Sequence, residues 1–271
     1  MTDAPPSPAS PEHVGAPVIG SIPAASVISE FLRVQSAVGP RSRVARFFGR
    51  SPLSSDSRSW YLGALGELDV ANRLDLLGAG WTVLHSVPIG TRGSDIDHVV
   101  VGPGGVFTIN TKFHEGANVW VGSRRLLVNG HKTDHLRNTR YEAQRVGRLL
   151  ERVLGRTIPV TGVIALVGIR RLTFKSRPED AVVLRASELT PWVSRRPPVF
   201  SAEQLAIVTA ALSAPTTWSA PPPAPDLGAF MDLRAETQSA RRVRLGWALG
   251  LFFGGPVALL SVLQALPTLV R

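Results

Sequence analysis

Two acidic residues, an amide and a lysine occupy alternate positions on either side of a short loop. Asp95 and Asp97 precede the Gly-Pro-Gly-Gly loop at residues 102–105, and Asn110 and Lys112 follow it. A four-residue glycine-rich loop between two β-branched runs predicts a hairpin in which Asp97 faces Asn110 and Asp95 faces Lys112. Because successive side chains of a strand alternate between its faces, all four would share one face, with facing Cβ atoms about 5 Å apart.

This set of side chains fits metal-dependent cleavage of a phosphodiester. Carboxylate and amide oxygens are suitable ligands for Mg²⁺ or Mn²⁺. A bound metal lowers the pKa of its water and neutralises charge on the phosphate, and a lysine orients the water or stabilises the transition state. The simpler alternative for Asp95 facing Lys112 is a cross-strand ion pair.

A third carboxylate is expected on the preceding helix, which the pattern places at residues 61–77. Glu67 lies on the apolar face of that helix with no other charge close to it on the helical wheel. A lone carboxylate on an apolar face needs a cation, a hydrogen-bond donor or a metal. The alternative is a glutamate near the helix N-terminus that the helix dipole favours.

Two stretches together resemble a known family. Residues 63–67, with the sequence Gly-Ala-Leu-Gly-Glu, and residues 94–112, which contain Asp-Ile-Asp-His and end in Thr-Lys, are similar to the nuclease-related domain (NERD). That family belongs to the PD-(D/E)xK, restriction-endonuclease-like superfamily, and the resemblance covers roughly residues 58–170. It implies an α/β fold with a mixed sheet flanked by helices, and a role in processing DNA.

The resemblance also implies roles for individual residues. Lys112, Asp97 and Glu67 would be catalytic, and Asp97, Asn110 and Glu67 would hold Mg²⁺ or Mn²⁺, with Asp95 as a further candidate ligand. The superfamily pattern has an acid two residues before the lysine, where this chain has Asn110. An amide brings no charge, so weaker metal binding is expected. Two hypotheses follow: a metal-dependent DNA phosphodiesterase, or an inactive domain that acts as a membrane-tethered nucleic-acid-binding or protein adaptor.

The composition adds limits. The chain has 271 residues, no cysteine and a net charge of +10. The missing cysteines exclude disulfides, Cys-ligated zinc and a thiol nucleophile, and the histidines show no zinc-binding spacing. The positive charge favours a polyanionic partner, either nucleic acid bound without sequence preference or an anionic membrane surface. Nothing in the pattern decides whether the chain forms a homo-oligomer.

Five arginines are candidate phosphate contacts. Arg137, Arg145 and Arg148 lie on one broad face of a predicted long helix, and Arg124 and Arg125 lie at a predicted hairpin tip. The alternatives are a solvated face of an amphipathic helix, partly balanced by Glu142 and Glu151, and an ordinary exposed turn.

The division of the chain follows its composition. We predict an N-terminal segment at residues 1–57, disordered over residues 1–25 and basic beyond a short helix. The nuclease-like domain follows at 58–213, a Pro-rich then basic linker at 214–244, and a single transmembrane helix at 245–270. Within the domain, strands are expected at residues 81–87, 96–101, 106–111, 118–121, 126–128, 158–167 and 181–184. Further helices are expected at residues 28–38, 135–154 and about 202–212, with a turn at 90–93. Asp134 is the candidate N-cap of the second of these helices, and Ser201 with Gln204 forms a capping-box pattern before the third.

The C-terminal segment is the clearest physical signal. Residues 245–270 carry no charge and one amide, and as a helix they would span about 39 Å, enough for a bilayer core of about 30 Å. Arginines lie on the near flank, and Arg271 alone lies beyond the segment. The positive-inside bias therefore predicts a single-pass protein of the cell membrane whose soluble domain faces the cytoplasm.

Overall fold

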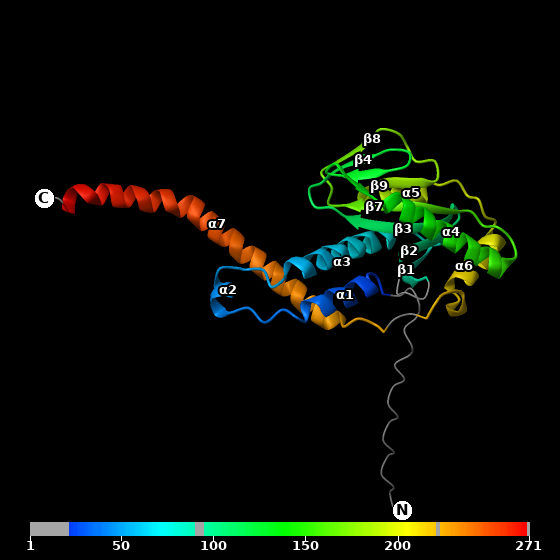
Figure 1. The fold of residues 1–271 in the computed structure, drawn as a ribbon, viewed down its shortest axis with the longest axis horizontal. Helices are drawn as coiled ribbons and strands as arrows, with labels where there is room; N and C mark the ends of the chain where they lie inside the picture. Colours follow the sequence, from blue (N-terminus) through cyan, green and yellow to red (C-terminus); the bar gives the residue numbers. More distant parts are fainter. Residues whose placement is uncertain (1–21, 90–94, 221–222, 270–271) are drawn as a thin grey trace, which may run out of the picture.

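The computed structural model describes residues 22–89, 95–220 and 223–269, with side chains in the last range as far as Phe253. Predicted disorder in residues 1–25 falls almost entirely outside these ranges, as does the predicted turn at 90–93. Figure 1 shows a body of sheets and helices from which one long C-terminal helix extends.

The helices are α1 (Ala25–Gln35), α2 (Arg43–Phe47), α3 (Ser55–Leu74), α4 (His135–Leu154), α5 (Ala186–Ser194), α6 (Ala202–Ser213) and α7 (Leu227–Leu269), with a 3-10 turn at Pro215–Thr217. The strands are β1 (Thr82–Pro88), β2 (Asp95–Gly102), β3 (Gly105–Phe113), β4 (Asn118–Val121), β5 (Leu126–Val128), β6 (His131–Thr133), β7 (Val160–Val167), β8 (Arg171–Phe174) and β9 (Ala181–Arg185).

The main sheet is mixed. Its five strands follow the order β1-β2-β3-β7-β9, and a smaller sheet follows the order β6-β5-β4-β8. The pairs β1–β2 and β2–β3 are antiparallel, whereas β3–β7 and β7–β9 are parallel. The predicted α/β fold, with a mixed sheet flanked by helices, is confirmed.

Helices cover both faces of the main sheet, which explains why its central strands read as continuous apolar runs. On one face, α4 and α6 pack against alternate residues of β2; the buried side chains there include Val146, Leu150, Val208, Leu212, Val99 and Val101. On the other face, α3 and α5 pack against the intervening residues; these include Val70, Leu74, Leu189, Val193, Val100, Phe107 and Ile109. Glu67, which α3 carries, therefore approaches the sheet from the face opposite to α4.

The N-terminal helix and the start of α7 belong to this packed structure. The ring of Phe31 in α1 is fully buried, 5.6 Å from Tyr61 of α3 and 5.8 Å from Phe230 of α7 between ring centroids. The helix expected at residues 28–38 is confirmed as α1, but composition alone did not indicate that it packs into the core. The predicted basic linker is likewise helical from Leu227 onward, because α7 continues through it.

Most predicted elements of the domain are confirmed within a few residues. Helix α4 has the predicted bounds and ends at Gly155, and α6 begins with the predicted capping box of Ser201 and Gln204. Asp134 precedes α4 as predicted, but its side chain makes no capping hydrogen bond and pairs instead with Arg137 at 3.0 Å. Strands β6 and β8 and helix α5 were not predicted.

No helix among the residues that could be searched, those the structure describes, is long and apolar enough to cross a membrane. The predicted transmembrane segment at 245–270 lies mostly beyond Phe253, outside the described side chains. It therefore stays a prediction from sequence.

Candidate active site

Strands β2 and β3 form the base of the site. Their register is the predicted one from Gly102–Gly105 as far as the pair His98–Ile109. Beyond that pair, the Oδ2 atom of Asp97 accepts a hydrogen bond of 2.6 Å from the backbone N–H of Thr111. The Asp97 carboxylate is thus anchored directly to β3, whereas the predicted pairings of Asp97 with Asn110 and of Asp95 with Lys112 are not part of the described ladder.

Asn110 of β3 meets an acid from the helix that covers this face. Its Nδ2 atom donates to the Oε1 atom of Glu142, in α4, over 2.7 Å. Asn110 is 4% exposed and Glu142 is partly buried. The remaining oxygens, Oδ1 of Asn110 and Oε2 of Glu142, are buried without a hydrogen-bond partner among the described residues. A carboxylate therefore faces the position where the superfamily pattern has its acid.

Glu67 comes from α3, on the opposite face of the sheet. The approach of α3 to β3 depends on Gly66, where a Cβ atom would lie 3.2 Å from the Cβ of Phe113. The close contact brings Glu67 to the sheet, where it is 6% exposed and its Oε2 atom has no partner within the described structure. The burial expected for Glu67 on the apolar face of its helix is confirmed, and its part in a metal site stays a prediction.

Charges of one sign accumulate here. Burial raises the pKa of the Glu67 carboxyl well above its usual range, and Asp97 and Asp95 raise it further against the opposing effect of Lys112. Burial also raises the pKa of Asp97, opposed by Lys112 and the Thr111 N–H. For Glu142, burial raises the pKa to about 7 although Asn110 donates to it. Lys112 alone does not neutralise these carboxyls. The excess negative charge favours either protonation of a carboxyl or binding of a cation.

Asp95 lies at the edge of the site. Its Oδ2 atom accepts a hydrogen bond of 2.6 Å from the hydroxyl of Ser26 in α1. Burial raises the pKa of Asp95, and Ser26 opposes this effect. Asp95 is therefore already held by the N-terminal helix, while it remains close enough to affect the pKa of Glu67 and Glu142.

The donor set suits a hard divalent cation. Three buried side-chain oxygens, Oε2 of Glu67, Oδ1 of Asn110 and Oε2 of Glu142, have no donor facing them in the described part of the chain. Unpaired buried oxygens of this type are costly unless a cation or water satisfies them. Within the described residues, however, no three His, Asp or Glu side chains are grouped closely enough to hold a metal by themselves. Any such site would thus need the Asn110 amide among its ligands.

Four of the histidines that the structure describes lie in two pairs. The Nδ1 atoms of His85 and His98 lie 2.8 Å apart in the core, and burial lowers the pKa of both rings. The Nε2 atoms of His114 and His135 lie 3.1 Å apart. Burial and the nearby Lys112 lower the pKa of His114, and the pKa of His135 is lowered to about 4. His114 thus lies close enough to Lys112 for that charge to act on it.

The predicted nucleic-acid contacts are not all brought together. Arg145 and Arg148 line a shared pocket on α4. Arg137 forms an exposed ion pair with Asp134. Arg124 and Arg125 are exposed at the turn between β4 and β5, in the smaller sheet.

Glu142 is the site residue that sequence reasoning missed. The signal that singled out Glu67 was present here too, because Glu142 follows the buried Thr139 by three residues and precedes the buried Val146 by four. A charge between two buried positions of one helical face should have raised the same question. Glu142 was interpreted only as a charge that balances the arginines of the helix.

Comparison with known proteins agrees with the family resemblance of the sequence. Residues 62–167 match the family model described as NERD, nuclease-related domain. Among solved structures, the small subunit (R.BspD6I2) of the heterodimeric restriction endonuclease R.BspD6I aligns with 80% of this chain and 97% of that chain. The identity is 10% and the TM-score is 0.23. No curated protein sequence matches the chain.

Proposed function

Residues 62–167 belong to the nuclease-related domain family, and we propose that this domain hydrolyses DNA phosphodiesters with Mg²⁺ or Mn²⁺. The hydrogen bond between Asn110 and Glu142 supports the proposal most directly. It brings a carboxylate from α4 to the position where β3 carries only an amide. The site therefore keeps two acids near Asn110, which are Asp97 and Glu142. The proposal therefore does not require an acid at position 110.

Each residue has a distinct part in the proposed site. Asp97, fixed by the Thr111 N–H, and Glu142, fixed by Asn110, would bind the cation through charged oxygens. The unpaired Oδ1 atom of Asn110 would be the third, neutral ligand, and Glu67 from the other face would add negative charge close to the ion. The bound ion would lower the pKa of a water and neutralise charge on the phosphate.

Lys112 acts on the reacting groups. It is the cation next to these carboxyls, and it influences the pKa of Glu67, Asp97 and Glu142. Its ammonium would orient the attacking water or stabilise the charge that develops on the phosphate oxygens. One water is consumed, one P–O ester bond breaks, and the products are a phosphate monoester and a hydroxyl.

Metal binding without DNA tests the proposal. Titration of Mn²⁺ into the full chain by calorimetry should show a site whose affinity falls about tenfold or more in Glu142→Gln. The double variant N110D/E142Q moves the carboxylate to β3 and should recover much of the affinity. Glu151→Gln is the matched control, since Glu151 lies on the same helix and is exposed. Plasmid nicking in Mn²⁺ should follow the same order.

The rival function is the inactive adaptor. It predicts that the wild-type chain neither binds Mn²⁺ nor nicks plasmid, and that Glu142→Gln changes nothing. Equal Mn²⁺ affinity in wild type and Glu142→Gln would remove the support for Glu142 as a ligand. Lys112→Ala separates metal binding from the chemical step, because this variant should lose nicking while Mn²⁺ binding persists.

Attachment to a membrane is a separate proposal that rests mainly on the uncharged segment at 245–270. The described part of this segment supports it, because Leu249, Leu251, Phe252 and Phe253 are all more than half exposed. Apolar side chains of this size would gain from burial in a bilayer or against a partner helix. With arginines on the near flank, the domain would face the cytoplasm.

A further inference from the structure

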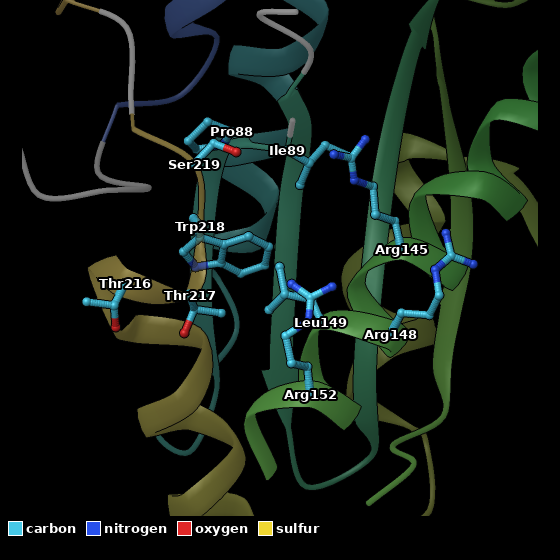
Figure 2. Close-up of a pocket in the computed structure, with 10 residues that line it drawn as sticks. All are labelled: Pro88, Ile89, Arg145, Arg148, Leu149, Arg152, Thr216, Thr217, Trp218 and Ser219. Carbon is cyan, nitrogen blue, oxygen red and sulfur yellow. The ribbon is translucent and has the colours of Figure 1, made fainter. Parts of the chain in front are cut away.

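A basic pocket of about 380 Å³ lies beside the candidate active site. Figure 2 shows α4 along one side of it, with Arg145, Arg148 and Arg152, and the segment after α6 along the other side, with Thr216 and Trp218. We propose that this pocket binds one phosphate of an unpaired nucleic-acid strand together with its nucleotide.

The charge in the pocket is unbalanced. The three arginines form no ion pair within the described residues, and no Asp or Glu lines the pocket. The acids of α4 are engaged elsewhere: Glu142 accepts from Asn110, and Glu151 accepts from Thr157. Three guanidinium groups along one helix repel one another unless an anion lies between them. A phosphate suits them because guanidinium can bind its oxygens through two parallel hydrogen bonds.

The opposite wall distinguishes this pocket from an ordinary solvated helix face. Trp218 is 8% exposed and packs into the core beneath the pocket, and its Nε1 atom donates to the carbonyl oxygen of Leu212 over 2.6 Å. The Thr217 hydroxyl donates to the carbonyl oxygen of Ala211, also over 2.6 Å. These bonds fix the wall, so that a ligand would enter a preformed pocket at little cost in ordering.

The position of the pocket identifies the strand as its ligand, and this step rests on the proposed function. Arg145 follows Glu142 by one turn of α4, and Pro88, which also lines the pocket, pairs with Asp95 across β1 and β2. A strand cleaved at the site and continuing along α4 would therefore reach the arginines. The volume is near the lower end of small-ligand pockets, about 300–1,000 Å³, so it suits a single nucleotide rather than a duplex.

Binding of DNA in the absence of metal tests the pocket. The full chain is titrated, in EDTA, against a fluorescently labelled single strand about 12 nucleotides long, and anisotropy is followed at several salt concentrations. The variant R145Q/R148Q/R152Q should bind at least about tenfold more weakly, with a salt dependence of log K reduced by about 2. The matched control R171Q/R177Q/R195Q removes the same charge from exposed positions outside the pocket and should lose less than about threefold.

A second variant guards against misfolding of α4. Thr216→Glu places a carboxylate on the opposite wall and should weaken strand binding to a similar extent, with an unchanged circular dichroism spectrum. The pocket is refuted if the control loses as much affinity as the triple variant. A matched duplex that binds as tightly as the single strand, and loses as much in the triple variant, would overturn the unpaired-strand assignment.

Three further outcomes separate this inference from its alternatives. If the variant R145Q/R148Q/R152Q no longer binds phosphatidylserine vesicles but binds the strand as wild type does, the arginines contact lipid head groups and the proposal is overturned. If Glu142→Gln abolishes Mn²⁺ binding and nicking while strand binding persists, both proposals stand. If wild type binds the strand through the arginines but never binds Mn²⁺, the pocket is supported and the proposed function fails.

Discussion

At the scale of single residues, the Asn110–Glu142 contact determines what the site can do. A carboxylate held by one amide donor, with its second oxygen unpaired and buried, is stable in two ways: as a neutral acid or beside a cation. Burial raises the pKa of Glu142 to about 7, so that both forms are accessible near neutral pH. Metal binding and proton binding should therefore compete at this residue.

The raised pKa of Glu142 has a consequence for stability without metal. The folded-state pKa of about 7 exceeds the usual 4.5, so the folded protein holds this proton more tightly than the unfolded chain does. The free energy of unfolding is therefore highest below a pH of about 4.5 and falls as the pH rises to about 7. Glutamine stays neutral throughout. The unfolding free energy of Glu142→Gln minus that of wild type should therefore rise by about 2 kcal/mol between these pH values, less than full linkage because Glu142 is partly exposed. Urea denaturation in EDTA at each pH measures it.

The comparison of Glu142→Gln with wild type isolates the effect of the Glu142 carboxyl. The His114–His135 pair, whose pKa values are lowered, gives an opposite slope between about pH 4 and 6.5, but it does so in both chains. Glu151→Gln, at an exposed position of the same helix, should follow wild type at every pH. A difference that stays constant across the pH range would contradict the raised pKa.

Local sequence could identify the residues of the hairpin but not the acid on α4. Asp97, Asn110 and Lys112 follow from strand alternation and a four-residue loop, because their spacing is fixed by local geometry. Glu142 lies 32 residues from Asn110, and only the packing of α4 on β3 joins them. Even within the hairpin, sequence could not indicate that Asp97 would bond the Thr111 N–H where the described ladder stops.

At the scale of elements, the position of α4 depends on its close approach to β7. A Cβ atom on Gly162 would lie 2.7 Å from Cγ2 of Thr139 and 2.9 Å from its carbonyl oxygen. One of these atoms belongs to the backbone, so the helix itself would have to move. Since α4 carries Glu142 and the arginines of the pocket, its distance from the sheet sets the geometry of both sites.

Gly162→Ala should therefore destabilise the fold by about 1–3 kcal/mol through overpacking, and it should weaken Mn²⁺ binding as α4 shifts. Gly147→Ala is the matched control, because its Cβ would meet only ordinary contacts at 3.8 Å or more. Alanine in a helix interior is better than glycine by up to about 1 kcal/mol, so this control should stabilise. Thermal unfolding of both variants measures the contrast, and a shift of the same sign in both would contradict the argument.

Elements with a strong periodic pattern were predicted, and short or interrupted elements were not. Helix α4 repeats buried residues at three- and four-residue spacing over 20 residues, and its bounds were predicted correctly. Helix α5 has nine residues with Pro191 inside, and β8 has four residues at the edge of the smaller sheet. Such segments are defined by their neighbours rather than by their own sequence.

At the scale of the whole molecule, α7 changes character along its length. In the first part of the helix, Phe230 and Ala240 are almost fully buried, and the ring of Phe230 packs against Phe31 and Tyr61. From Leu245 to Phe253 large apolar side chains are exposed, although Trp247 still donates from its Nε1 atom to the carbonyl oxygen of Phe47 over 2.8 Å. Figure 1 shows the rest of α7 extending away from the domain. The first part of the helix is thus an element of the fold, and the second part presents apolar surface.

The predicted membrane attachment can be separated from attraction by the basic flank. The full chain should float with vesicles in a density gradient, and a chain ending at Arg244 should not, because the apolar segment supplies the insertion energy. The variant R241Q/R242Q/R244Q keeps that segment without its flanking charges and should still float, including at high salt, where head-group attraction is screened. If the shortened chain floats as well as the full chain, or if salt releases the full chain, attachment depends on charge, and the prediction for residues 245–270 is wrong.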